Sequence, residues 1–126
     1  MKIVLIDDTP EIAELLTFDL RDRGHQVVAS GFTTEINELV DAEAADAVVF
    51  DCSVFNMSEG LFDLIRGDPR HHALPVVIIS DTPEQADASL RSRQAEHVLL
   101  VPKPFSGSQI ARALGELVDR ASDRVR

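Results

Sequence analysis

The sequence predicts an α/β fold in which helices cover both faces of a parallel β-sheet. Five short apolar runs, rich in β-branched residues, alternate along the chain with segments whose apolar residues recur at helical spacing. This alternation is typical of consecutive βα units, and five such units predict a five-stranded sheet with five helices. A chain of 126 residues is long enough for one domain with a buried core. We expect that domain over residues 1–121, and a tail or the start of a linker over residues 122–126.

The five predicted strands are mainly apolar, and the runs at residues 3–6 and 47–50 are continuous, as expected for strands that are buried on both faces of a parallel sheet. They cover residues 3–6, 26–29, 47–50, 75–79 and 98–101. Right-handed crossovers between successive strands limit the topology to a few strand orders.

The helices between these strands carry recognisable start signals. Thr9 and Pro10 supply a cap and a first-turn proline for the first helix. Its predicted buried stripe consists of Ile12, Leu15, Leu16 and Leu20. Ser58 is expected to cap the third helix, and capping-box patterns at residues 82–85 and 106–109 predict the starts of the fourth and fifth. The fourth helix has the weakest apolar stripe, so we expect it to be loosely docked.

Composition excludes several classes of protein. The net charge of −10 argues against a domain that grips nucleic acid by itself. No apolar run approaches the roughly 18–20 residues of a membrane helix, and the first residues lack a secretory signal, so a cytoplasmic protein is predicted. The single cysteine, Cys52, excludes an internal disulfide and is expected to be a small buried apolar residue. His71 and His72 are expected in an exposed loop.

Three carboxylates fall at the ends of predicted strands. Asp7 and Asp8 follow the first strand and Asp51 follows the third, and ligands bind at the carboxyl ends of parallel strands. Two charges about 4 Å apart cost roughly 4 kcal/mol at an effective dielectric near 20, and a hard divalent cation such as Mg²⁺ relieves this repulsion. A metal site is therefore predicted. In the alternative interpretation, Asp7 and Asp8 only end a strand and cap a helix, and Asp51 is an ordinary turn residue.

Two further polar features follow the last two strands: Ser80 after the fourth, and Lys103-Pro104-Phe105 after the fifth. With the aspartates at their own strand ends, in this order, the chain resembles the receiver domain of two-component response regulators over nearly its whole length. The resemblance implies a flavodoxin-like (βα)5 fold with strand order 2-1-3-4-5. It also implies that residues 1–121 form a receiver domain.

The resemblance implies a role for each acidic residue. Asp51 is the phosphoacceptor, a nucleophile that takes a phosphoryl group from a phosphohistidine and forms an acyl phosphate. Asp8 binds Mg²⁺ directly and Asp7 binds it through water. Asp51 and the backbone carbonyl of Ser53 complete the protein's share of the metal ligands.

The resemblance also assigns the residues after the fourth and fifth strands. Ser80 donates a hydrogen bond to the phosphoryl group, and Lys103 supplies a point charge to the same oxygens. The Lys103–Pro104 peptide bond is expected to be cis. Without the resemblance, Ser80 is interpreted as a turn former and Lys103 as a surface lysine.

Two departures from the family pattern lie next to this chemistry. Asp81 stands where the family usually has alanine or glycine, and Leu100 stands where it usually has an aromatic switch residue. If Asp81 faces the site, its charge opposes an incoming phosphoryl group that carries about −1.5 to −2 charges. If it faces solvent, it favours the start of the helix at Thr82 and Pro83. We expect Asp81 and Leu100, together with Thr82 and Pro104, to modulate the switch.

The predicted function is a phosphorylation-controlled signalling switch that is no enzyme beyond its own phosphotransfer and dephosphorylation. The expected phosphodonor is a histidine kinase or a phosphotransfer protein. Because no further domain follows the fifth predicted helix, the output is expected to be a contact with a downstream protein. Neither nucleic acid nor a membrane is an expected partner of this domain.

Three alternatives belong to other classes. The first is an atypical receiver that acts as a phosphorylation-independent protein-interaction module. The second, an aspartate-nucleophile phosphohydrolase, generally has Asp-x-Asp at the nucleophile, whereas this chain has Asp51-Cys52-Ser53. The third, a flavin-binding module of the same fold class, is disfavoured because Asp7 and Asp8 would repel a phosphate after the first strand.

Overall fold

The computed structural model describes residues 1–52 and 55–125, with the side chains of residues 1–52 and 56–119. The strands are β1 (Lys2–Asp7), β2 (Gln26–Ser30), β3 (Ala47–Asp51), β4 (Val76–Ser80) and β5 (Val98–Pro102). The helices are α1 (Pro10–Asp22), α2 (Ile36–Glu43), α3 (Phe55–Gly67), α4 (Pro83–Ser92) and α5 (Gly107–Val125), and a short 3-10 helix, η1, covers Pro69–His71. Every predicted strand and helix is present. The predicted tail is helical over residues 122–125, because α5 continues through them.

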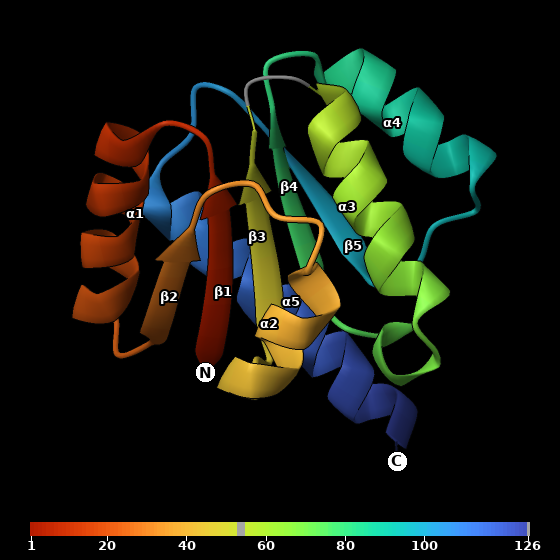
Figure 1. Cartoon of the computed structure of the whole chain (residues 1–126), viewed down its shortest axis with the longest axis horizontal. Helices are drawn as coiled ribbons and strands as arrows, with labels where there is room; N and C mark the ends of the chain where they lie inside the picture. Colours follow the sequence, from red (N-terminus) through yellow and green to blue (C-terminus); the bar gives the residue numbers. More distant parts are fainter. Residues whose placement is uncertain (53–54, 126) are drawn as a thin grey trace.

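All four strand pairings are parallel, and the strand order is β2-β1-β3-β4-β5. This order confirms the α/β fold class and the flavodoxin-like topology that the resemblance implied. Figure 1 shows the sheet with the carboxyl ends of its strands at the upper edge. In the described part of the chain, no helix is long and apolar enough to cross a membrane.

Two apolar layers enclose the sheet. Ile3 and Leu5 of β1 belong to the layer that α1 and α5 cover, and Val4 and Ile6 belong to the layer that α2 and α3 cover. Successive strand residues point to opposite faces, so both layers draw on the same strand. This explains why the predicted strands at residues 3–6 and 47–50 are continuous apolar runs. In Figure 1, α2 and α3 lie in front of the sheet and α5 lies behind it.

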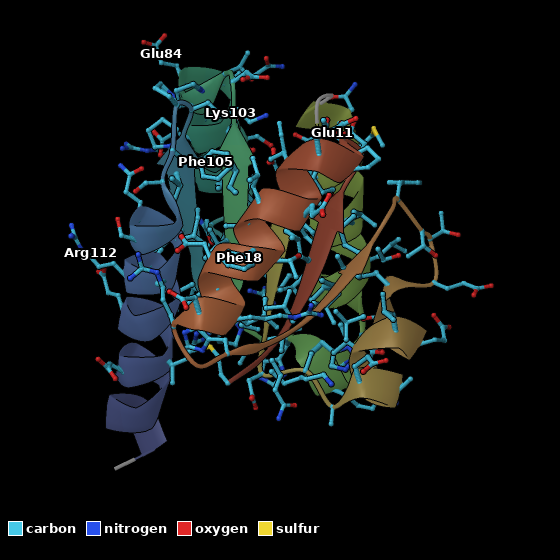
Figure 2. All side chains as sticks on the ribbon, turned by 90° about the vertical axis from the view of Figure 1, so that its left-hand side faces the viewer. Glu11, Phe18, Glu84, Lys103, Phe105 and Arg112 are labelled. Atoms are coloured by element: carbon cyan, nitrogen blue, oxygen red, sulfur yellow. The ribbon has the colours of Figure 1, made fainter. Side chains whose placement is uncertain are left out.

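α1 exposes two large apolar side chains. Leu15, which was predicted to belong to the buried stripe, is 73% exposed, and Phe18 is 74% exposed. Consecutive helical residues point about 100° apart, so with Leu16 turned into the core, Leu15 faces away from the sheet. Figure 2 shows Phe18 on the side of α1 that faces the viewer.

The start of α3 differs from the prediction. The helix begins at Phe55, so Ser58 lies inside it and does not cap it. Ser58 is buried, as are Leu61 and Ile65, which follow it at helical spacing on the face that packs against the sheet. Its position on this apolar face, three residues into the helix, is the reason that the predicted cap is wrong.

Of the two predicted capping boxes, one forms and one does not. At the start of α5, the backbone N–H of Ser106 donates to Gln109 Oε1 at 2.7 Å, and the N–H of Gln109 donates to Ser106 Oγ at 3.3 Å. At the start of α4, within the described residues, the side chain of Thr82 makes no capping hydrogen bond. The side chain of Thr9, before α1, makes none either.

The prediction of an exposed loop is right for His72 and wrong for His71. His71 is buried in η1. Its Nδ1 lies 2.7 Å from Asn37 Oδ1 and its Nε2 lies 2.8 Å from Asp41 Oδ1, both on α2. The amide of Asn37 is oriented because its Nδ2 donates to the carbonyl of Leu64 at 2.9 Å. These partners are distant in sequence, so a local pattern could not reveal them.

We expect His71→Ala to lower the free energy of unfolding by about 2–3 kcal/mol, because it removes a buried ring and leaves Asn37 and Asp41 without this partner. The adjacent exposed residue provides the control, and His72→Ala should change stability by no more than about 0.5 kcal/mol. Urea unfolding measures both. Equal losses in the two variants would show that the His71 contacts do not stabilise the fold.

Candidate functional site

The polar ends of four strands meet at one edge of the sheet. Asp7 of β1 is paired in register with Asp51 of β3, and Ser80 of β4 is paired with Pro102, the residue before Lys103. The backbone N–H of Lys103 donates to the carbonyl of Ser80 at 2.9 Å. The structure therefore brings these predicted site residues together at the upper edge in Figure 1, where ligands of parallel sheets bind.

Asp51 and Lys103 form a close ion pair. Asp51 is only 2% exposed, and its Oδ1 lies 3.0 Å from Lys103 Nζ. The same ammonium lies 3.7 Å from Oδ2 of Asp81, whose side chain is 60% exposed. Burial disfavours the charge of Lys103, but the hydrogen bond and charge of Asp51 and the charges of Asp81 and Asp7 outweigh it, so the pKa of Lys103 is raised. Lys103 is therefore a cation shared between two carboxylates.

Among the three aspartates of the acidic cluster, Asp7 has a raised pKa. It is buried, and the backbone N–H of Thr9 donates to its Oδ1 at 2.7 Å. Burial raises the pKa of Asp7 to about 6; the Thr9 hydrogen bond opposes the rise, and the charges of Asp51 and Asp8 add to it. Asp8 is half-buried and its Oδ1 accepts a hydrogen bond from Thr9 Oγ1 at 3.5 Å. The predicted repulsion among the three carboxylates is therefore present.

The oxygens of this cluster fit a hard cation. Among the described residues, Asp7 Oδ2 and Asp51 Oδ2 are buried atoms without a hydrogen-bond partner. An unpaired buried oxygen is costly, and Mg²⁺ prefers carboxylate and carbonyl oxygens. In the described part of the chain, no three His, Cys, Asp or Glu side chains are arranged as a group that could hold a metal ion. The Lys103 ammonium lies beside Asp51 Oδ1 and is the positive charge next to that carboxylate in this structure. The predicted ligand Ser53 lies outside the described residues.

The hydroxyl of Ser80 is engaged in the loop before α4. Ser80 Oγ accepts a hydrogen bond from the backbone N–H of Thr82 at 2.9 Å and lies 3.4 Å from Thr82 Oγ1. The Thr82 hydroxyl therefore lies beside Ser80, which explains why it does not cap α4. The oxygen of Ser80 is occupied as an acceptor, while its hydrogen remains a donor for Thr82 or for a group in the site.

Three other predicted features are placed by the structure. The Lys103–Pro104 peptide bond is cis, as predicted. Cys52 is buried, and burial raises the pKa of its thiol, which confirms its interpretation as a small apolar residue. Leu100, at the position of the expected aromatic switch residue, is half-buried and packs against the core layer under α2 and α3.

The fold and this edge of the sheet define an α/β domain with an acidic site and a lysine at the carboxyl ends of its strands. The sequence matches the profile of the family described as "Response regulator receiver domain" over residues 3–115. The chain belongs to this family, which confirms the predicted resemblance. Receiver domains are signalling switches and not classical enzymes.

Similar proteins agree with this assignment. The "Probable transcriptional regulatory protein TcrX" of Mycobacterium tuberculosis is 28% identical over 120 residues, which are 94% of this chain and 50% of that protein. The chain therefore spans half the length of this curated relative. A sensor protein from Polaromonas sp. JS666 has a similar fold, with a TM-score of 0.81, 22% identity, and coverage of 94% of this chain and 96% of that chain. A receiver domain of a Pseudomonas aeruginosa PAO1 sensor histidine kinase, with a magnesium ion coordinated in its active site cleft, has a TM-score of 0.73, 18% identity, and coverage of 94% and 97%.

Mg²⁺ is expected to stabilise the protein without any phosphodonor. An ion present at ten times its dissociation constant adds about 1.4 kcal/mol, which raises the melting temperature by about 5 °C for a domain of this size. The measurement is a melting curve at pH 8, above the pKa of Asp7 of about 6. Asp8→Ala should lose the shift, and the exposed control Asp22→Ala should keep it. An identical shift in Asp8→Ala would place the bound ion elsewhere.

Proposed function

We propose that this chain is a phosphorylation-controlled signalling switch whose phosphoacceptor is Asp51. The environment of Asp51 carries the proposal: it is a buried carboxylate at a strand end with an ammonium 3.0 Å from one oxygen. Its other oxygen has no hydrogen-bond partner among the described residues. Phosphoryl transfer depends mainly on placement and on neutralising charge. Lys103 provides one positive charge there. Asp7 and Asp8 can bind a metal cation such as Mg²⁺, which would provide further positive charge.

In the proposed reaction, a carboxylate oxygen of Asp51 attacks the phosphorus of a phosphohistidine. A P–O bond forms while the P–N bond breaks, and the imidazole leaves. Asp7, Asp8 and Asp51, with the backbone carbonyl of Ser53, would hold Mg²⁺, which when bound would neutralise charge at the phosphoryl oxygens. Lys103 holds its charge at the same oxygens, and Ser80 orients one of them through its hydroxyl hydrogen. The chain catalyses no other reaction than its own phosphotransfer and dephosphorylation.

The proposed donor is a histidine kinase or a phosphotransfer protein. α1 starts two residues after Asp8 and exposes Leu15 and Phe18, and exposed apolar side chains near a reactive group suit a protein contact. We propose that the receiver domain spans residues 1–121, works in the cytoplasm, and signals through a downstream protein. The net charge of −10 supports an output that involves neither nucleic acid nor a membrane surface.

One observation favours a second candidate, a receiver that acts as a phosphorylation-independent interaction module. Asp81 lies 3.7 Å from Lys103, so a carboxylate competes for the cation that a phosphoryl group would use. With Leu100 in place of an aromatic switch residue, the domain could present one fixed surface. The two candidates differ in whether the protein accepts a phosphoryl group.

Acetyl phosphate tests the proposal. With Mg²⁺, the intact mass of the protein is expected to increase by one phosphoryl group, in an adduct that survives acid and is lost in base, as an acyl phosphate is. A chelator should prevent its formation. The absence of any adduct would favour the interaction module, and an adduct of equal yield with the chelator would contradict the role of Mg²⁺.

A further inference from the structure

α4 is weakly held by apolar contacts. Of its ten residues, all of which the structure describes, only Ala86 is buried. In Figure 1, α4 lies beside α3 at the outside of the molecule. Elements with few buried apolar contacts open most easily, so the polar contacts at the two ends of α4 decide how firmly it is held.

The C-terminal end of α4 is fixed to α3 by four residues that we call the Arg93 cluster: Glu59, Asp63, Ser89 and Arg93. The guanidinium of Arg93 donates to both oxygens of Asp63, from Nε at 2.8 Å and from Nη2 at 3.1 Å. Its Nη1 lies 3.5 Å from Glu59 Oε2 and donates to the hydroxyl of Ser89, which in turn donates to Glu59. A two-pronged arginine–carboxylate contact fixes geometry as well as distance.

The N-terminal end of α4 is held by groups of the phosphoacceptor site. Asp81, two residues before the helix, lies 3.7 Å from Lys103 Nζ. The backbone N–H of Thr82 donates to Ser80 Oγ at 2.9 Å, and the carbonyl of Thr82 accepts the N–H of Ala86 at 3.0 Å. Lys103 Nζ therefore holds this end of the helix and is also the cation that a phosphoryl group on Asp51 would engage, whereas Ser80 Oγ can keep its bond from Thr82 while its hydrogen donates into the site.

A phosphoryl group changes only one of these two attachments. It places a charge of about −1.5 to −2 next to Lys103. This charge competes with the single negative charge of Asp81 for the Lys103 ammonium, and it also repels Asp81. The Arg93 cluster shares no residue with the site, so it stays intact. We propose, on the basis of the function proposed above, that Asp81 is an autoinhibitory contact. Phosphorylation of Asp51 displaces Asp81 from Lys103, and the N-terminal end of α4 is loosened because only the Ser80–Thr82 hydrogen bond then holds it, while the Arg93 cluster holds the C-terminal end.

Residue-resolved hydrogen exchange of the full chain tests this inference, with Mg²⁺ and beryllium fluoride as the probe that takes the place of the phosphoryl group. The probe is expected to speed exchange several-fold at amides 86–88 and to leave amides 90–93 unchanged. Asp81→Asn should speed exchange at amides 86–88 without the probe. A uniform change along α4, or unchanged exchange in Asp81→Asn, would overturn the inference.

A matched pair of variants tests the fixed end. Arg93→Gln is expected to speed exchange several-fold at amides 90–93 and not at 86–88. Arg91→Gln, whose ion pair with Asp87 at 2.8 Å lies within α4, should change neither group of amides, and equal effects of the two variants would overturn the role of the Arg93 cluster. If no Mg²⁺-dependent ¹⁹F signal of bound beryllium fluoride appears, the proposed function fails. Asp81→Asn and Arg93→Gln, measured without the probe, then still decide whether the two attachments exist.

Discussion

Asp51→Asn is expected to reduce the phosphoryl adduct formed with acetyl phosphate and Mg²⁺ by at least about a hundredfold, as loss of a nucleophile does. Asparagine keeps the shape of aspartate but has no anionic oxygen to attack phosphorus. It also removes the negative charge that holds Lys103 Nζ at 3.0 Å. The variant therefore loses both the nucleophile and the arrangement of the cation beside it. Intact-mass measurement of the adduct over time gives the ratio of rates.

The control for this loss is another carboxylate that is remote from the site. Asp22 is an exposed residue in the last turn of α1. Asp22→Asn should therefore be labelled by acetyl phosphate at the wild-type rate. Melting curves of both variants establish that they are folded. An Asp51→Asn protein that is folded and is labelled at the wild-type rate would exclude Asp51 as the phosphoacceptor.

Asp81→Ala is expected to speed labelling by acetyl phosphate about tenfold at low salt, since about 1.4 kcal/mol of transition-state free energy corresponds to that factor. The carboxylate of Asp81 repels the incoming phosphoryl group and competes for Lys103, whose ammonium is 3.7 Å away. The effect should shrink as salt rises, because the side chain of Asp81 is 60% exposed and its charge is screened.

Two variants separate charge from shape in this experiment. Asp81→Asn keeps the size of the side chain and should speed labelling nearly as much as Asp81→Ala. Asp87→Ala removes an exposed carboxylate from α4 itself and should have no effect. Equal labelling rates for the wild type and both Asp81 variants across the salt series would leave Asp81 as a helix-start residue only.

The parts of the fold that depend on local order were predictable from the sequence. Apolar runs such as residues 3–6 and 47–50 become strands because both faces of the sheet are covered, so every side chain in the run is buried. The carboxylates that end these runs must then lie at one edge of the sheet, as Asp7 and Asp51 do. The strand order itself came from the family resemblance. The roles of these residues in phosphoryl transfer stay predictions.

The parts that depend on contacts between distant segments were not predictable in this way. His71 is buried with its two ring nitrogens within hydrogen-bond distance of Asn37 and Asp41, which lie on α2, more than one element away. The direction of Asp81, left open by the sequence, is set by Lys103 on the neighbouring strand end. The Arg93 cluster was missed altogether. Its signals in the sequence are two pairs with a spacing of four residues, Glu59 with Asp63 on α3 and Ser89 with Arg93 at the end of α4.

The most direct test of the account is to locate the phosphoryl group chemically. The labelled protein is treated with borohydride, which reduces an aspartyl phosphate to homoserine, and the digested peptides are sequenced by mass spectrometry. The account predicts homoserine at position 51 and unchanged aspartate at positions 7, 8 and 81, with no conversion when Mg²⁺ is withheld. Homoserine at one of those three positions, or a phosphoryl group found on a serine or histidine instead, would contradict it.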